Sequence, residues 1–195
     1  MRNSGFLMAF TFLFALMGCS SDDSEPNDTQ ERDYYFHFKA DGAQVDYEYQ
    51  PETQINLTGS ILFDSSTNTN VVSIAGIEDI FDSGTQNRLT IFLSDSADIV
   101  TGIDYTNIVG EGDRTPSSIF LMNYYDEQGN LYSAALNTGP TALYEFAKVT
   151  FTEITDDKIS GTFSGTLTWY DLSNGTVQLV DSVLISEGIF SVPRY

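Results

Sequence analysis

The sequence has little of several residues on which protein chemistry often depends. Its 195 residues include one cysteine, one histidine and eight lysine or arginine residues, against 28 aspartate and glutamate residues. With Cys19 alone, an intramolecular disulfide is impossible, and a zinc site built from one histidine and one cysteine is not credible. The net charge of −20 repels phosphate groups. This argues against nucleic acid and anionic lipid headgroups as partners.

Long hydrophobic runs are also scarce, and the clearest one lies near the start of the chain. Residues Phe6–Met17 are uncharged and apolar and follow Arg2. A helix that spans a membrane needs about 20 apolar residues, so this run is too short. A basic start, a short apolar stretch and small residues behind it are typical of a secretory signal peptide. We therefore expect residues 1–18 to be a signal peptide that is not part of the fold.

The single cysteine follows this segment directly. Leu16-Met17-Gly18-Cys19 resembles the lipobox of bacterial lipoproteins, in which a peptidase cuts before a cysteine that carries lipid through a thioether. The resemblance implies lipid attachment at Cys19 and durable anchoring to a membrane, because stable anchoring takes more than one acyl chain. The alternative is an ordinary signal peptide followed by a free thiol, which exported proteins rarely keep.

Residues 19–33 predict a flexible acidic tether. Residues 20–33 contain no hydrophobic residue and six acidic ones, so they cannot bury enough apolar area to offset the entropy of ordering. The start of the segment, Cys19-Ser20-Ser21-Asp22-Asp23, resembles the export signal of surface lipoproteins in the Bacteroidota. The resemblance implies the outer membrane and the cell surface. The alternative is a spacer on a lipoprotein that faces the periplasm.

Residues 34–195 predict a single all-β domain. Ile159–Tyr170 alternates with period two and places Phe163, Leu167 and Trp169 on one face, which indicates an antiparallel sheet with one face on a core. Gln54–Phe63 alternates similarly, with Ile55, Leu57, Ile61 and Phe63 inward. Many short strands favour a β-sandwich, with a closed or partly open β-barrel as the alternative. The other expected strands are Tyr34–Ala40, Gln44–Tyr49, Val71–Ile77, Arg88–Ser94, Ser118–Tyr125, Leu131–Leu136, Ala147–Ile154, Val177–Ile185 and Ile189–Val192.

Both ends of this domain carry a familiar pattern. The strand around Ile159-Ser160-Gly161-Thr162-Phe163 and the closing Gly188-Ile189-Phe190 resemble an "ISGTF…GxF" ending that recurs in small Bacteroidota lipoproteins of unknown function. The opening Phe36–Gly42 is similar to the first hairpin of that group. The resemblance covers the middle of the domain poorly. It implies a β fold and a lipid anchor but no activity, because these residues belong to strands and turns.

Sequence motifs for catalysis are missing. His37 is expected to point outward because Phe36 and Phe38 occupy the opposite face, and no nucleophile-elbow sequence accompanies it. The acidic residues leave open a glycan hydrolase, which needs only two suitably spaced carboxylates. We expect no cofactor except a possible structural calcium, for which Asp64–Asn70 and Asp79–Asp82 offer oxygen ligands without EF-hand spacing.

Aromatic residues allow one further kind of site. Exposed aromatic rows on β-sandwiches stack against sugar rings, but Trp169, Tyr47 and Tyr49 are expected in the core, whereas Tyr170 faces outward. The sequence thus favours a membrane-anchored, non-catalytic binding or interaction module whose partner is a glycan or an outer-membrane protein. The alternatives are the glycan hydrolase and an accessory subunit docked through an exposed sheet edge.

Overall fold

The structure is a computed structural model and describes residues 34–81, 86–139, 143–173 and 175–195. The chain divides between Arg32 and Asp33, and the unit from Asp33 to Tyr195 contains all the described residues. The expected signal peptide, the lipid-attachment residue Cys19 and the tether 19–33 lie outside the described residues. Within the described ranges, no helix is long and apolar enough to cross a membrane.

The described residues form eleven strands in one antiparallel sheet, which confirms the all-β prediction. The order of its main path is β2-β1-β11-β10-β8-β7-β5-β4-β3, and β6 and β9 extend it from β10. The strands are β1 Tyr35–Ala40, β2 Ala43–Glu48, β3 Leu57–Asp64, β4 Thr69–Ile77, β5 Arg88–Asp95, β6 Asp104–Thr106, β7 Ile119–Tyr125, β8 Leu131–Ala135, β9 Ala147–Ile154, β10 Lys158–Asp171 and β11 Gln178–Pro193.

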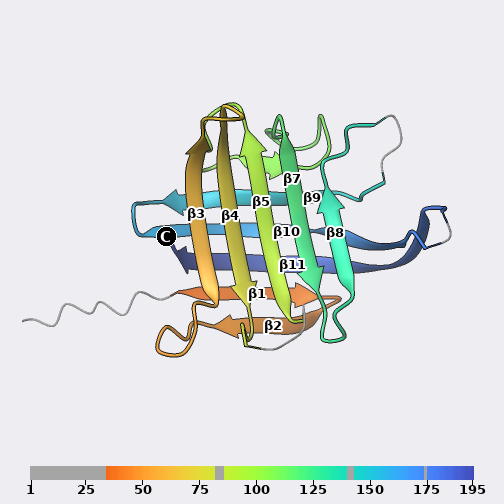
Figure 1. The fold of residues 1–195 in the computed structure, drawn as a ribbon, viewed down its shortest axis with the longest axis horizontal. Helices are drawn as coiled ribbons and strands as arrows, with labels where there is room; N and C mark the ends of the chain where they lie inside the picture. The colour runs from red at the N-terminus through yellow and green to blue at the C-terminus, as the bar shows by residue number, and fades with distance from the viewer. Residues whose placement is uncertain (1–33, 82–85, 140–142, 174) are drawn as a thin grey trace, which may run out of the picture. The chain divides into compact units, whose positions relative to one another are not determined.

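The sheet bends back on itself until it is nearly closed into a barrel. In Figure 1, β3, β4, β5, β7 and β8 cross in front of β9, β10 and β11 and end near β1, and β2 lies below them. One end of the sheet reaches back to its middle, because Gly59 of β3 bridges to Arg194 just after β11. The backbone N–H of Tyr195 also donates to the carbonyl of Gly59 (2.9 Å). This near-closure corresponds to the barrel alternative that accompanied the sandwich prediction.

The long β10–β11 hairpin joins the two layers. β10 pairs with β9 from Ile159 to Gly165 and then with β8, where Thr168 faces Ser133. Strands that pass between layers need bends, and irregularities in the β10–β11 register supply them. One irregularity lies at Glu187, whose φ of 52° places it in the left-handed region. The two strands expected at 177–185 and 189–192 are therefore one continuous strand with a bulge.

A cluster of aromatic rings fills the interior. Phe36 and Phe38 of β1 are fully buried, and their rings lie 5.3 and 5.9 Å from the ring of Phe163 in β10. Tyr47 of β2 joins them at 5.8 Å from Phe36, as predicted for a core residue. Trp169 is only partly buried, but it packs on this core. The alternation in β1 and β10 was thus a correct guide to the buried face.

The expected pattern in Gln54–Phe63 is wrong at both ends. β3 begins only at Leu57, and Ile55 is 57% exposed whereas Asn56 is fully buried. Asn56 turns inward because its side-chain amide donates to the carbonyls of Glu48 and Ile77. Phe63, at the far end, is 61% exposed. β3 is an edge strand of the main path of the sheet and pairs there only with β4.

Candidate functional site

The most distinctive pocket lies beside the unpaired edge of β2 and has a volume of about 380 Å³. β2 pairs only with β1, and Figure 1 shows it beyond the lower ends of β4, β5 and β7. We call the hollow the Tyr47 pocket. Its lining includes Asp46 and Tyr47 of β2, Glu78 and Asn87 of the β4–β5 connection, Tyr124 of β7 and Glu127 of the β7–β8 turn.

Tyr47 is the most unusual residue of the pocket. Its side chain is 1% exposed, and no described residue forms a hydrogen bond with its buried hydroxyl. Burial raises the pKa of this hydroxyl strongly, with smaller contributions from Tyr124 and Glu78. Both neighbours line the pocket, as Tyr47 itself does, so the buried hydroxyl lies close to the pocket lining. A buried hydroxyl without a partner costs about 1–3 kcal/mol of stability, so the absence of a partner for Tyr47 among the described residues calls for an explanation.

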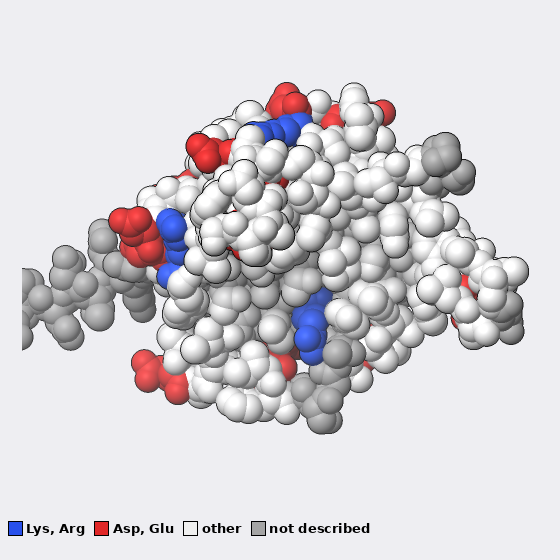
Figure 2. Space-filling view, turned by 45° about the horizontal axis from the view of Figure 1, so that its top comes forward, with Lys and Arg blue, Asp and Glu red and all other residues white. Residues whose placement is uncertain are grey.

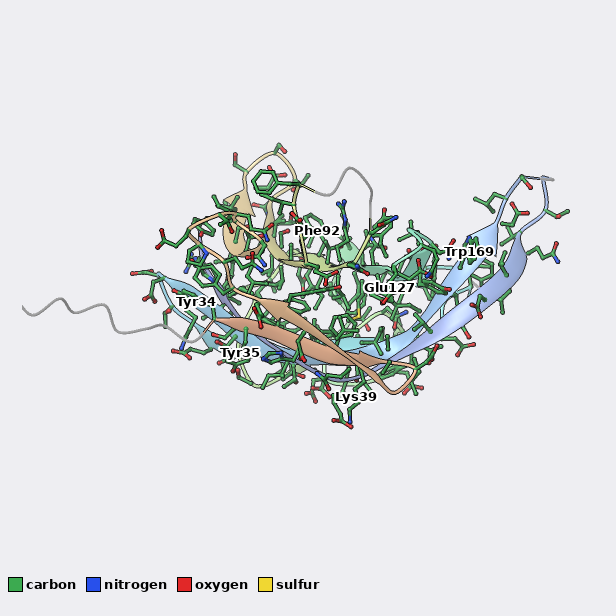
Figure 3. The ribbon with its side chains drawn as sticks, turned by 90° about the horizontal axis from the view of Figure 1, so that it is seen from below. Tyr34, Tyr35, Lys39, Phe92, Glu127 and Trp169 are labelled. Carbon is green, nitrogen blue, oxygen red and sulfur yellow. The ribbon has the colours of Figure 1, made fainter. Side chains whose placement is uncertain are left out.

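Exposed carboxylates surround the pocket. Asp46 accepts hydrogen bonds from His37 and Gln44, both at 2.7 Å. Glu78 accepts one from the side-chain amide of Asn87. Figure 3 looks at the domain from below, with Glu127 labelled. The three carboxylates supply negative charge and hydrogen-bond acceptors to one hollow.

Five lysine and arginine residues of the domain pair with carboxylates away from the pocket. Figure 2 shows each basic patch of one face beside acidic side chains. Arg88, which begins β5, lies with its guanidinium carbon 5.4 Å from the centre of the Tyr125 ring. Five ion pairs of lysine or arginine lie outside the pocket lining, namely Lys39–Glu187, Arg114–Asp95, Lys148–Asp104, Lys158–Glu153 and Arg194–Asp156.

His37, the only histidine of the sequence, pairs with an acidic residue of the pocket lining. His37 is exposed, as predicted, and its Nδ1 lies 2.7 Å from a carboxylate oxygen of Asp46. Its ring stacks on Tyr35 with centroids 5.3 Å apart. The side chain of His37 thus holds the side chain of Asp46 at the rim of the pocket. Its role in the geometry is thus to orient a carboxylate.

The two loops proposed for calcium use their carboxylates locally. Asp64 accepts bonds from the backbone N–H and the hydroxyl of Ser66 at 2.8 and 2.7 Å and from Thr67 at 3.0 Å. These bonds, led by that from the Ser66 hydroxyl, lower the pKa of Asp64. Asp79 accepts from the N–H of Phe81, and Asp82 lies outside the described residues. Structural calcium at these loops stays a prediction.

Aromatic side chains form a second, smaller pocket on the outside of the sheet. It has a volume of about 270 Å³ and is lined by Tyr144, Trp169 and Tyr170 with neighbouring leucines and hydroxyl groups. The rings of Tyr144 and Tyr170 meet edge to face at 6.2 Å. Tyr170 faces outward as expected, and its hydroxyl donates to the carbonyl of Leu143. The rings are therefore fixed, but they form a corner and not a flat row.

An apolar arm extends beyond this pocket. The tip of the β10–β11 hairpin projects from the body past Trp169, as Figure 3 shows. Its exposed apolar side chains are Leu172, Val177, Leu179 and Val180. Such an exposed apolar surface is what the alternative function, an accessory subunit that docks on another protein, would require.

Sequence reasoning identified only part of the Tyr47 pocket. It placed Tyr47 in the core, which is correct, but it did not single out Glu78, Asn87 or Glu127. Glu78 and Asn87 lie in the β4–β5 connection and Glu127 lies in the β7–β8 turn, and both are distant from β2 in the sequence. Only the bending of the sheet brings them to β2. An acidic residue directly after a strand is ordinary loop chemistry, so no local signal distinguishes them.

Comparison with known proteins supplies no relative for this chain. No family model matches it, no curated protein matches it, and no solved structure matches its fold.

Proposed function

We propose that the protein is a lipid-anchored, extracytoplasmic and non-catalytic binding module whose ligand enters the Tyr47 pocket. The features of residues 1–18 and the lipobox at Cys19 support export and anchoring. The acidic residues after Cys19 favour the outer membrane and the cell surface. The resemblance to small Bacteroidota lipoproteins is in keeping with this proposal and adds no activity to it.

One observation carries the binding proposal, namely the buried and unpartnered hydroxyl of Tyr47 beside an open pocket. Folded proteins satisfy nearly all buried polar groups, and exceptions call for an explanation. Local rules of folding are broken mainly at functional sites. A ligand that hydrogen-bonds to Tyr47 would satisfy the hydroxyl that no described residue pairs with.

Binding is favoured over glycan hydrolysis by the state of the carboxylates. A hydrolase needs one carboxyl group to act as an acid and a second to act as a base or nucleophile. Asp46 is held by His37 and Gln44, and Glu78 is held by Asn87. Carboxylates fixed in this way serve recognition well, because they are already oriented before the ligand arrives.

Anchoring and location are tested in intact cells that express the wild type or Cys19→Ala. Incorporation of a labelled fatty acid and cleavage by added protease are measured on the same samples. The proposal predicts label in the wild type, no label in Cys19→Ala, and cleavage of the wild type from outside. Labelled protein that resists protease until the outer membrane is opened would place it on the periplasmic face. Wild type without label would contradict anchoring.

A further inference from the structure

We propose that the Tyr47 pocket binds a positively charged organic group, either an ammonium or a guanidinium. The inference rests on the proposed function as a binding module and adds the chemical class of its ligand. Its basis is one juxtaposition: three acidic residues, Asp46, Glu78 and Glu127, line the same pocket as Tyr47, whose buried hydroxyl has no hydrogen-bond partner among the described residues.

The groups around the pocket match a ligand that carries hydrogen-bond donors. Carboxylates only accept hydrogen bonds, and ammonium and guanidinium groups only donate them. Hydrogen bonds between such charged partners are roughly twice as strong as neutral ones. The hydroxyl of Tyr47 can accept a bond from the same ligand. An anionic ligand would instead meet three like charges.

The aromatic rings of the pocket suit the same class of ligand. Tyr47 and Tyr124 are both buried and both line the hollow together with the three acidic residues. Cations are attracted to the faces of tyrosine rings, more so where water is excluded. A cation therefore gains from the buried part of the pocket as well as from its exposed rim.

The volume of the pocket limits the size of the ligand. Its value of about 380 Å³ lies at the lower end of the range for small-molecule sites, about 300–1,000 Å³. A cationic head with a short aliphatic stem fits such a space. The head can belong to a free amine or to a lysine or arginine side chain of a partner protein. The unpaired edge of β2 is open to an extended peptide.

A divalent metal is a poorer match than an organic cation. Calcium takes 6–8 oxygen ligands at short range. In residues 34–81, 86–139, 143–173 and 175–195, no three His, Cys, Asp or Glu side chains are grouped closely enough to hold a metal ion. Asp46, Glu78 and Glu127 thus do not form such a group.

The test is titration calorimetry on the full-length protein purified in mild detergent. The probes are agmatine, which is a free guanidinium amine, and the blocked peptide Gly-Arg-Gly. A peptide with citrulline in place of arginine is the neutral, nearly isosteric control. We expect the arginine peptide or agmatine to bind at least tenfold more tightly than the citrulline peptide, and more weakly as salt is added. Binding of agmatine alone identifies a free amine, and binding of the peptide alone identifies a protein partner.

Variants locate the binding. Glu78→Gln and Tyr47→Phe are expected to weaken it at least tenfold, whereas Glu111→Gln, which makes the same charge change on an exposed loop, leaves it unchanged. Equal affinity for the citrulline peptide, or binding that Glu78→Gln does not alter, would overturn the cationic ligand. If instead neutral maltose binds and Tyr47→Phe abolishes this binding, the cationic ligand is wrong and the binding module stands. If none of the probes binds, the cationic ligand is overturned.

Discussion

The ring of Phe36 in β1 packs directly on Gly76 in β4. A Cβ atom on Gly76 would lie 2.6 Å from Cγ of Phe36, a distance that requires the ring or the strand to move. This contact brings the two layers of the sheet close together at the centre of the aromatic core. Gly76→Ala is expected to lower the free energy of unfolding by about 1–3 kcal/mol, as overpacking does. Urea unfolding measures the change.

A second variant separates this contact from general strain in β4. Phe36→Leu removes the ring that blocks the added methyl group, at the cost of core packing. In the double variant Gly76→Ala, Phe36→Leu, the loss of unfolding free energy should be smaller than the sum of the losses in the two single variants, by at least about 0.5 kcal/mol. Strict additivity would show that the cost of Gly76→Ala arises elsewhere.

The buried amide of Asn56 joins three segments of backbone. It donates to the carbonyls of Glu48 (2.7 Å) and Ile77 (3.1 Å) and accepts from the N–H of Gln50 (3.2 Å). Asn56→Ala leaves these groups without the amide, so unfolding free energy should fall by about 2–3 kcal/mol. Asn70→Ala, at a surface bond to Asp98, is the control and should change it by less than about 0.5 kcal/mol. Equal effects would contradict the role of Asn56.

Asp104 in β6 makes the free energy of unfolding depend on pH in the acidic range. The hydrogen bond from Lys148 (2.7 Å) and that from Thr150 lower its pKa below the usual value of 3.8. Because the folded pKa is below the unfolded one, the stabilisation is present above pH 3.8 and is lost as pH falls below it. Asp104→Asn should lower stability at pH 7 and flatten its fall between about pH 4 and pH 2. Unfolding curves across this range measure both effects.

Lys148→Met gives an independent check on the same pair. It removes the partner that contributes most to the low pKa of Asp104, so its pH profile should be flattened in the same direction. If the free energy of unfolding still falls steeply in acid in both variants, other carboxylates cause the acid sensitivity.

Local patterns predicted the parts of the fold that depend on neighbouring residues. A first hairpin was expected at Phe36–Gly42, and Asp41 and Gly42, which connect β1 and β2, both have positive φ, 49° and 83°. The inward side of β10 was also predicted correctly at Phe163 and Leu167, both of which are buried. Turn chemistry and period two are properties of short segments, so the sequence contains them directly.

Features that depend on distant contacts were missed. β6 has only three residues, too few to show a period, and it forms by pairing with β9. Asn56 is buried because of carbonyls at positions 48 and 77, which no local pattern records. The Tyr47 pocket is the same kind of feature, since Glu78 and Glu127 reach β2 only through the bending of the sheet.

The most direct test of the binding site is the stability of Tyr47→Phe without ligand. Removal of an unpaired buried hydroxyl should raise the free energy of unfolding by about 1–2 kcal/mol. Tyr105→Phe is the matched control, because the buried hydroxyl of Tyr105 accepts a bond from the N–H of Val100 at 2.8 Å, and this variant should be destabilised. If Tyr47→Phe is instead destabilised by as much as Tyr105→Phe, the hydroxyl of Tyr47 is already satisfied in the folded protein. The pocket would then lack the unpaired group on which the binding proposal depends.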